Sequence, residues 1–489
     1  MEKYINRKNV ILFQPSIGYM DDMRTSPTLP LSLLSAVSIV AKFYDIKIID
    51  QRINKNWKDS LQKYISSQTI CVGVTCLTGR MISEGVEFSK YVKMTYGLPV
   101  VWGGVHPTLL PEETVENENI DIVVIGEGEE TFYELVKSID EGNPLENIKG
   151  ICFKKDKKII RTPPRDFVIL DKLPDIPYHL VNLDDYLPLY NGRRSIFFQS
   201  SRGCPYNCSY CYNNVVNKRK WRAFSAEETL SRIQRLVTKY KNIQDIYFVD
   251  DEFFIDIVRA EKIITGLKKM NITWQVQGVD ILCLKNMDEQ FLWLLKNSGC
   301  VRLTVGIESG SQRIREIMNK KGTVEDILSV IQKLKKYNII IYCSFMVGID
   351  SEKIEDIKET VNLIFEMQKI NPNVRNSPFY IYTPYPGTKM YEIVKNKYKI
   401  PKSLLDWSNY GEWSQVKYRY NKNFYELLHF VSLFIDKKIN EYNVSFIIKI
   451  LCNIYRPLAR WRLKNLYFGF MIEKWFYNFF CLVFKVRKI

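Results

Sequence analysis

The chain has 489 residues, more than one ordinary hydrophobic core accommodates, and this favours two or three domains. The net charge of +16 favours an acidic partner, either nucleic acid or anionic lipid, although a lysine-rich composition alone gives the same excess. Eleven cysteines are spread along the chain and the first eight residues begin no signal peptide, which excludes a small secreted disulfide scaffold. The apolar runs are shorter than the roughly 18–20 residues of a bilayer span, which excludes a membrane-spanning helix.

Residues 1–145 alternate between short apolar runs and amphipathic segments. Strands are expected at 10–15, 46–50, 70–75, 99–102 and 121–125, and helices at 31–43, 57–66, 80–95 and 129–140. This alternation predicts a parallel, doubly wound sheet, on which ligands bind beyond the carboxyl ends of the strands. Glycines in the loops at those ends let a bulky ligand approach the backbone closely. The candidate ligand-binding residues in these loops are Gln14, Thr78, Gly79, Gly103, Gly104, His106, Gly126, Glu127 and Gly128.

Residues 146–190 break this pattern. Apolar residues at 151–153 and 159–160, on either side of several lysines, predict a hairpin, and the prolines from Pro163 to Pro177 exclude a longer regular element. This stretch is expected to connect two domains.

Residues 191–400 contain six further strand patterns separated by helical patterns. The strands are expected at 195–200, 245–249, 273–276, 302–305, 339–343 and 379–382, and the helices at 225–240, 256–269, 288–297, 311–319, 323–336 and 353–369. Six such units predict an incomplete (β/α) barrel with its chemistry at the carboxyl ends of the strands. The polar residues at those ends are Asp250, Asp251, Glu252, Gln277, Glu308 and Ser344.

Three cysteines lie in one loop directly after the first of these six strands. Cys204, Cys208 and Cys211 are four and three residues apart, and Gly203 and Pro205 force the chain to turn around them. Such a loop can supply three thiolates to one side of an iron–sulfur cube, which leaves the fourth iron without a protein ligand and open to a reactant. The alternatives are three unrelated loop cysteines or half of a zinc ribbon. A four-ligand zinc site needs a further Cys or His, and the chain has only three histidines.

The Cys-x3-Cys-x2-Cys loop, with the aromatic Tyr210 before its last cysteine, resembles the loop of radical S-adenosylmethionine enzymes. The resemblance implies that the open iron chelates S-adenosylmethionine. It also implies that an electron from the cluster cleaves this molecule to a 5′-deoxyadenosyl radical, which abstracts a hydrogen atom from the substrate.

The same resemblance implies a pocket for S-adenosylmethionine at the strand ends of the barrel. Residues 250–252 would meet the methionine amino group, Glu308 and Gln277 the ribose hydroxyls, and Lys320 the methionine carboxylate, with Ser344 nearby. The alternatives are a helix-capping role for Glu308, a solvated helix end at Lys320, and simple turn formation at residues 250–251.

The segments 102–108 and 124–131 (Trp-Gly-Gly-Val-His-Pro-Thr and Val-Ile-Gly-Glu-Gly-Glu-Glu-Thr) resemble the cobalamin-binding domain that precedes many radical enzymes. The resemblance implies cobalamin at the nine loop residues named above. Because no Asp-x-His-x-x-Gly segment is present, it implies cobalamin without a histidine ligand to cobalt. The alternatives are a domain that has lost its cofactor and a His106 that only bonds to the backbone. Cys71 and Cys76 could suggest a second cluster but are expected to be buried small hydrophobes.

Residues 401–489 are expected to be helical, with 424–450 apolar on one face. From residue 450 onward eight Lys and Arg accompany a single acidic residue, Glu473, and large aromatics crowd residues 475–484. Basic residues between large aromatics suit a helix that lies in a membrane interface. A helix that packs its aromatics on the barrel and an RNA-binding surface are the alternatives, although no RNA-binding module signature is present.

The sequence therefore predicts an α/β protein with four parts: a cobalamin-binding Rossmann-like domain at 1–145, a linker at 146–190, a radical S-adenosylmethionine core, a partial (β/α)6 barrel, at 191–400, and a helical, basic-aromatic region at 401–489. The favoured reaction is methyl transfer to an unactivated carbon of a lipid or other secondary metabolite. It would consume two S-adenosylmethionine molecules, one for the methyl group and one for the radical. A radical cyclase or carbon–carbon coupling enzyme, an RNA methylthiotransferase and a non-enzymatic sensor are the alternatives.

The expected setting is a reducing cytoplasm, with peripheral attachment to the inner face of the membrane. The expected partners are a small-molecule or lipid substrate and a flavodoxin- or ferredoxin-type electron donor, and nucleic acid is not expected.

Overall fold

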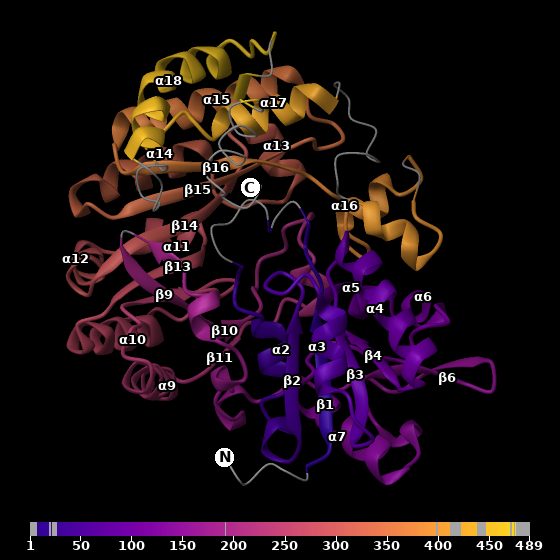
Figure 1. Cartoon of the computed structure of the whole chain (residues 1–489). Coiled ribbons are helices and arrows are strands. Elements are labelled where there is room, and N and C mark those ends of the chain that lie inside the picture. The colour runs from indigo at the N-terminus through magenta and orange to yellow at the C-terminus, as the bar shows by residue number, and fades with distance from the viewer. Residues whose placement is uncertain are drawn as a thin grey trace. The chain divides into compact units, whose positions relative to one another are not determined.

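A computed structural model describes residues 7–18, 21, 27–190, 192–397, 400–410, 422–437, 446–469, 472–473 and 475. These residues form two compact units (Figure 1). The first contains the described residues up to Tyr186 together with 400–410, and the second contains the rest from Leu187 onward. The segment 400–410 therefore follows the second sheet in the sequence and belongs to the first unit in space.

The first unit is built on a seven-stranded sheet with the order β2-β1-β3-β4-β5-β6-β7. Strands β1 to β5 are parallel, and β6 and β7 extend the sheet as an antiparallel hairpin. The predicted parallel, doubly wound sheet is confirmed. The strands are β1 (Asn9–Gln14), β2 (Asp45–Asp50), β3 (Thr69–Thr75), β4 (Val100–Gly103), β5 (Ile122–Val124), β6 (Ile151–Lys155) and β7 (Lys158–Arg161).

One predicted helix of this unit is shorter than expected. The sequence pattern predicts a helix over 31–43, but α2 ends at Ala36 and only a 3-10 turn follows at Val40–Lys42. Val37, Ile39 and Val40 are β-branched, and crowded β-branched side chains disfavour a continuing α-helix. The helices of the unit are α2 (Leu31–Ala36), α3 (Trp57–Tyr64), α4 (Met81–Tyr96), α5 (Val105–Leu109), α6 (Pro111–Glu116) and α7 (Glu129–Glu141).

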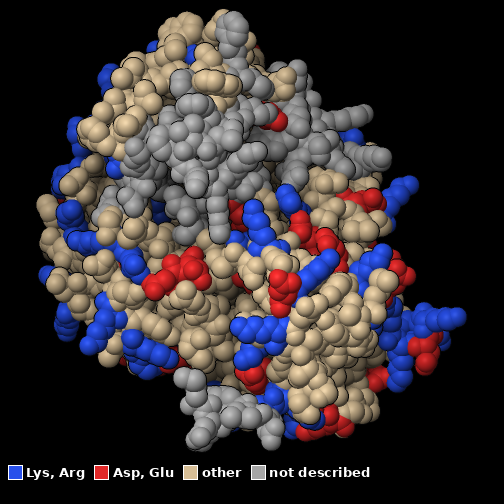
Figure 2. All heavy atoms as spheres, in the orientation of Figure 1, with Lys and Arg blue, Asp and Glu red and all other residues tan. Residues whose placement is uncertain are grey.

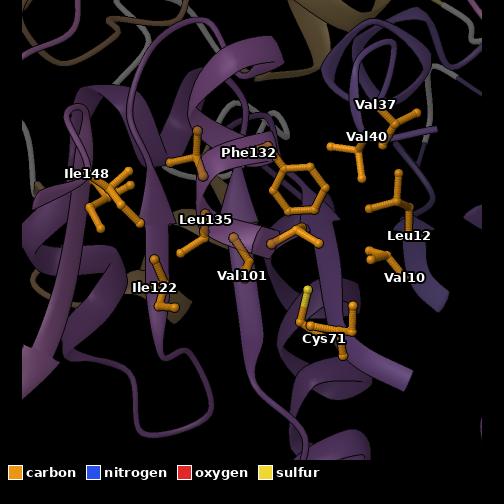
Figure 3. Close-up of a cluster of buried hydrophobic side chains, with 14 of the residues drawn as sticks. Val10, Leu12, Val37, Val40, Cys71, Val101, Ile122, Phe132, Leu135 and Ile148 are labelled. Carbon is orange, nitrogen blue, oxygen red and sulfur yellow. The ribbon is translucent and has the colours of Figure 1, made fainter. Parts of the chain in front are cut away.

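The core of the first unit lies where α7 packs on the sheet. Figure 3 shows Phe132 of α7 among side chains of the strands, with Leu12 from β1 and Val101 from β4 on either side. Cys71 of β3 is fully buried in the same cluster, and Cys76 just after β3 is fully buried as well. The prediction that these two cysteines are buried small side chains is confirmed.

The second unit is built on a curled sheet with the order β16-β15-β14-β13-β12-β9-β8. Six of these strands are parallel, and the short edge strand β8 pairs antiparallel with β9. The six strands confirm the predicted partial (β/α) barrel. The strands are β8 (Leu189–Tyr190), β9 (Arg193–Phe198), β12 (Asp245–Phe248), β13 (Thr273–Val279), β14 (Cys300–Glu308), β15 (Ile340–Val347) and β16 (Val374–Ile381).

Polar side chains cap several helices of this unit at their first turn. Ser225, Asp256, Asp288 and Thr323 each accept a backbone N–H three residues further on, which satisfies a donor that has no partner within the helix. The helices are α8 (Asn213–Val216), α9 (Ala226–Lys239), α10 (Ile257–Met270), α11 (Ile281–Asn286), α12 (Glu289–Asn297), α13 (Gln312–Ile317), α14 (Val324–Leu334), α15 (Ile354–Ile370), α16 (Lys389–Val394), α17 (Lys422–Ser432) and α18 (Phe446–Lys464).

The predicted continuous helix over 424–450 is wrong in extent, because α17 ends at Ser432 and residues 433–437 are not helical. The edge strand β16 accounts for this end. The Asn376 side chain donates to the Ser432 carbonyl at 3.1 Å, and the Asn376 N–H donates to the Asp436 carboxylate at 2.8 Å. These bonds cover a strand edge that would otherwise present unpaired backbone groups, and they hold the chain in a non-helical path.

Candidate functional site

Cys204, Cys208 and Cys211 lie in one loop of the second unit, and a small ribbon closes this loop. Strand β10 (Ser201–Arg202) pairs antiparallel with β11 (Arg222–Ala223), and the loop with α8 lies between them. Gly203, which begins the loop, has a φ of 85°, and a Cβ atom there would lie 2.0 Å from the Lys220 carbonyl oxygen. Only glycine fits this turn.

Neighbouring segments fix the course of the loop. The Ser209 N–H donates to the Met318 carbonyl at 2.8 Å, and the Asn319 side chain donates to the Asn207 carbonyl at 2.7 Å. The three cysteines are each half-buried. In the part of the chain that the structure describes, no three His, Cys, Asp or Glu side chains converge as they would around one metal ion. A cube instead takes each of three thiolates on a different iron.

The turn after β12 supports the start of the cysteine loop. Asp250 is buried and accepts hydrogen bonds from the N–H and hydroxyl of Ser200 at 2.7 and 2.6 Å and from the Ser201 hydroxyl at 2.7 Å. Asp251 accepts the N–H of Gly203 at 2.7 Å. The sequence predicts that residues 250–252 meet the methionine amino group. In the structure, Asp250 and Asp251 bond to the residues that lead into the cysteine loop.

A buried group of charged side chains lies beside the cysteine loop. The Lys320 ammonium donates to the Asp280 carboxylate at 2.8 Å, and the two side chains are only 8% and 4% exposed. Burial disfavours the charge on Lys320, but Asp280, Cys208 and Glu308 outweigh this effect and raise the pKa of its ammonium. Lys320 is therefore held as a cation inside the protein.

Glu308 faces this lysine from the end of β14. Burial raises the pKa of its carboxyl, while Lys320 and the Tyr210 hydroxyl oppose the shift. Glu308 has a φ of 68°, a conformation that is uncommon outside glycine and that recurs at functional sites. A Cβ atom on Gly306 would lie 2.7 Å from the Glu308 carboxylate, so this glycine leaves the room that the carboxylate occupies.

Acidic groups outnumber cations in this group. Glu252 is 2% exposed, and burial together with the nearby Asp280 raises the pKa of its carboxyl to about 8. Three carboxylates (Glu252, Asp280 and Glu308) thus lie near Lys320 and Arg315, and the Arg315 guanidinium donates to backbone carbonyls. A cationic ligand beside these acids would favour the ionised form of Glu252, so the group suits a ligand that brings positive charge.

The predicted residues Gln277 and Ser344 lie apart from these contacts. Gln277 is exposed on β13, and Ser344 is half-buried in β15 with its hydroxyl 3.5 Å from the Val305 carbonyl. Sequence reasoning missed Asp280, the partner of Lys320. The sequence pattern predicts a strand that ends at Val276, whereas β13 continues to Val279, so Asp280 directly follows its carboxyl end.

The carboxyl edge of the first sheet is shaped by glycines. Gly104, after β4, has a φ of 103°, and a Cβ atom there would lie 2.7 Å from the Cys76 carbonyl oxygen. Gly126, after β5, has a φ of 79° and no atom within 4 Å of such a Cβ, so its surroundings are open. Gly103 at the end of β4 has its nearest such neighbour at 3.9 Å. The ends of β4 and β5 therefore expose backbone that a flat, bulky ligand can approach.

The other predicted residues of this edge contact the chain itself. The Gln14 side chain is buried and donates to the Pro15 carbonyl at 3.1 Å, and the Glu127 carboxylate accepts the Val168 N–H at 3.0 Å. A Cβ atom on Gly128, at the start of α7, would lie 3.3 Å from the Ala36 side chain.

His106 is fully buried beneath this edge. Its Nδ1 lies 3.0 Å from the Thr78 hydroxyl, and its ring lies edge-on to Trp407 from the segment 400–410, with 5.8 Å between centroids. Burial lowers the pKa of His106 to about 4. A neutral, enclosed histidine supports the loop that contains Thr78 and Gly79. A Cβ atom on Gly79 would lie 3.7 Å from the carbonyl of Tyr410 in the same segment.

Comparisons with known proteins agree with this arrangement. The Radical SAM superfamily model matches residues 198–364, and the B12 binding domain model matches residues 26–136. PH0819, an uncharacterized methyltransferase of Pyrococcus horikoshii, is 30% identical over 426 residues, which are 86% of this chain and 88% of that protein. The chain belongs to the cobalamin-binding radical S-adenosylmethionine family.

Two further proteins are similar to this chain. The anaerobic magnesium-protoporphyrin IX monomethyl ester cyclase of Rubrivivax gelatinosus is 25% identical over 370 residues, which are 73% of this chain and 64% of the cyclase. The solved structure of the cobalamin-dependent S-adenosylmethionine radical enzyme OxsB is 16% identical, with a TM-score of 0.74 over 99% of this chain and 76% of that chain. The second likeness shows a shared fold.

The cofactors of this family are a [4Fe–4S] cluster, S-adenosylmethionine and cobalamin, and the two sites fit them. The cysteine loop offers three thiolates, and the acidic group next to it suits a molecule with a sulfonium and an ammonium. The open glycine-lined edge of the first sheet suits a broad macrocycle. His106 is enclosed beneath that edge rather than presented to a ligand.

The substitution His106→Gln is expected to weaken the pH dependence of stability. The folded protein keeps the ring neutral down to about pH 4, while the unfolded chain, with the ordinary pKa of 6.5, binds a proton as the pH falls. The unfolded state therefore binds more protons below neutral pH, and this single group lowers the free energy of unfolding by about 2 kcal/mol between about pH 7 and pH 5. Urea unfolding at both pH values should show that the variant loses about 2 kcal/mol less than wild type.

The same variant separates a supporting histidine from a cobalt ligand. His106→Gln is expected to retain cobalamin, and electron paramagnetic resonance of the cob(II)alamin form should show no nitrogen superhyperfine splitting in either protein. Splitting in the wild type that disappears in the variant would contradict the enclosed position of His106. An equal pH dependence in both proteins would contradict its neutral state.

Proposed function

We propose that the protein transfers a methyl group from S-adenosylmethionine to an unactivated carbon of a lipid or other secondary metabolite. When bound, the cofactors of the family supply a radical for hydrogen abstraction and a methyl group for transfer. The protein's own contribution is to hold and orient the reactants, because proximity and orientation account for a large share of such a rate enhancement.

In this proposal the second unit binds the cluster and S-adenosylmethionine. Cys204, Cys208 and Cys211 are the cluster ligands, with Tyr210 beside them. Lys320, oriented by Asp280, pairs with the methionine carboxylate, and Glu308 accepts the ribose hydroxyls. Glu252 takes the methionine ammonium, since the Asp250 carboxylate is already bonded to Ser200 and Ser201. Gln277 and Ser344 line the outer part of the pocket.

The first unit binds cobalamin at its carboxyl edge in this proposal. The backbone of Gly103, Gly104 and residues 126–128 approaches the macrocycle, and Gln14 lies at the end of β1, which β3 separates from β4. Thr78 and Gly79 form the loop after β3, which His106 supports from beneath. No protein nitrogen ligates cobalt.

The observation that carries the proposal is the extent of the similarity to the Pyrococcus methyltransferase. At 86% of this chain, the aligned region takes in both units and not the barrel alone. This similarity over both cofactor-binding units supports methyl transfer, because the relative is described as an uncharacterized methyltransferase.

Isotope labelling tests the proposal. Anaerobically reconstituted protein is supplied with reductant, S-adenosylmethionine deuterated at its methyl group, and candidate lipids. We expect a product heavier by one methyl group that carries the deuterium, together with 5′-deoxyadenosine and S-adenosylhomocysteine. The control is the cobalamin-free protein, which should form 5′-deoxyadenosine without a methylated product. Products without deuterium would overturn the assignment.

A radical cyclase is the second candidate, because the Rubrivivax cyclase aligns with 73% of this chain. The same experiment separates the two reactions. A cyclase product has lost hydrogen atoms and contains no deuterium, whereas a methylated product has gained the labelled group.

The proposal includes partners and a location. Reduction of the cluster needs a one-electron donor, and the net charge of +16 suits an acidic carrier of the flavodoxin or ferredoxin type. A reducing cytoplasm keeps the cysteines available as ligands. Peripheral attachment to the inner face of a membrane would bring the enzyme to a lipid substrate.

A further inference from the structure

Helix α18 presents large apolar side chains on its outer face. Positions 446, 447, 450, 454, 458 and 461 follow one another at steps of one, three and four residues, which places them on one side of a helix. Each of these side chains is between 40% and 75% exposed. The residues are Phe446, Ile447, Ile450, Ile454, Leu458 and Trp461.

The opposite face of α18 is bound to the second unit. Cys452, Ala459 and Leu463 are buried on that side. The Arg456 guanidinium donates to the Asp436 carbonyl at 2.9 Å, and the Arg460 guanidinium donates to the Ile435 carbonyl at 2.9 Å. Because these contacts fix the rotation of the helix about its axis, the apolar face remains on the outside.

The charge around this face is positive. Residues 446–464 contain five Lys and Arg and no Asp or Glu. The nearby acids Asp436 and Glu473 are buried, and Glu473 pairs with Arg462 at 3.0 Å. Lys437 and Lys464 are exposed. In Figure 2 the part of the surface that α18 occupies in Figure 1 is mostly tan with some blue.

We infer that the outer face of α18 binds an anionic lipid surface, with its apolar side chains in the interface and its lysines on the phosphates. In the part of the chain that the structure describes, no helix is long and apolar enough to cross a membrane. An amphipathic, basic helix of this kind lies in the plane of the interface. The inference specifies the membrane partner named in the proposed function and does not require methyl transfer.

Charge favours lipid over a second copy of the chain as the occupant. Two α18 faces in contact would bring Lys449 and Lys464 of each helix together, and residues 446–464 offer no acidic residue to pair with them. Such like-charge contact is unfavourable. The aromatic run 476–484 that the sequence singles out lies outside the described residues, so the inference rests on α18 itself.

Two matched double variants of the full-length protein test this surface. Ile454→Glu/Leu458→Glu places two carboxylates on the α18 face, where the side chains are 72% and 47% exposed. Val258→Glu/Ile393→Glu makes the same change in charge on α10 and α16, where they are 62% and 65% exposed. We expect the first variant to lose at least about tenfold in co-sedimentation with phosphatidylglycerol/phosphatidylcholine vesicles, and the second to bind nearly as wild type.

The mixed vesicles are compared with pure phosphatidylcholine vesicles at low and high salt. We expect weaker binding to the neutral vesicles and a partial loss in salt, because screening removes the electrostatic attraction but not the apolar burial. Equal binding of both variants to the mixed vesicles would overturn the inference. A second result would also overturn it: a wild-type dimer in sedimentation analysis that persists in the control variant and is absent in the α18 variant. This result would assign the face to a second copy of the chain. Formation of 5′-deoxyadenosine is measured in parallel and tests the proposed catalytic function independently of membrane binding.

Discussion

Replacing Cys204, Cys208 and Cys211 together with alanine is expected to remove the iron–sulfur cluster and to reduce 5′-deoxyadenosine formation to the level without enzyme. The three residues lie in one loop, which the Gly203 turn and the Asn319–Asn207 hydrogen bond hold in place. A cube attached by three thiolates has no protein ligand left once they are removed. Iron and sulfide content, visible absorbance and product formation measure the result.

The matched control is Cys283→Ala. Cys283 lies on α11 with its sulfur 3.5 Å from the hydroxyl of Tyr206, which is part of the cysteine loop. It is therefore a half-buried cysteine in the same surroundings that lies outside the motif. The control should keep its cluster and its activity. A cluster that persists in the triple variant, or that disappears in Cys283→Ala, would contradict the assignment of ligands.

Lys320→Met is expected to lower the free energy of unfolding by about 3–5 kcal/mol, because it leaves buried carboxylates without their counter-charge. The ammonium lies 2.8 Å from Asp280, and both side chains are nearly enclosed. The variant should also lose most 5′-deoxyadenosine formation, since the proposed partner of the methionine carboxylate is removed. Chemical denaturation and product assays measure the two effects.

Two further variants serve as controls for Lys320→Met. Lys285→Met breaks a pair of similar length, 2.6 Å from Asp326, but with the lysine side chain 48% exposed. It should cost no more than about 1 kcal/mol, since exposed ion pairs are weak. Lys320→Met/Asp280→Asn should recover part of the stability, because it removes the unpaired charge, but not the activity. A single Lys320→Met variant as stable as Lys285→Met would show that the buried pair contributes little.

Local patterns were sufficient to predict most of the fold. All eleven predicted strands of the two parallel sheets are present, because strands buried on both faces are continuous apolar runs that the chain itself displays. Errors occurred where tertiary contacts override propensity. The helix over 424–450 ends early because Asn376 of β16 bonds to residues 432 and 436, a pairing between segments about 60 positions apart.

Local sequence patterns predicted only part of the candidate site. The three cysteines are local in sequence, and the constraint on Gly203 acts within its own loop. The roles of the acidic residues depend on contacts with residues far away in the sequence. Asp250 and Glu252 are neighbours in the chain, yet one bonds to Ser200 and Ser201 while the other lies near Asp280.

The sequence by itself determined the cysteine loop and the two sheets, because cysteine spacing and hydrophobic periodicity are properties of short segments, and its resemblance to a known family implied the cofactors. The tertiary structure alone decided which charges are buried together, that His106 is enclosed by Trp407, and which face of α18 remains outside. Each of these depends on contacts between segments far apart in the chain. Burial and the proximity of other charges then set the protonation and the exposure of each group.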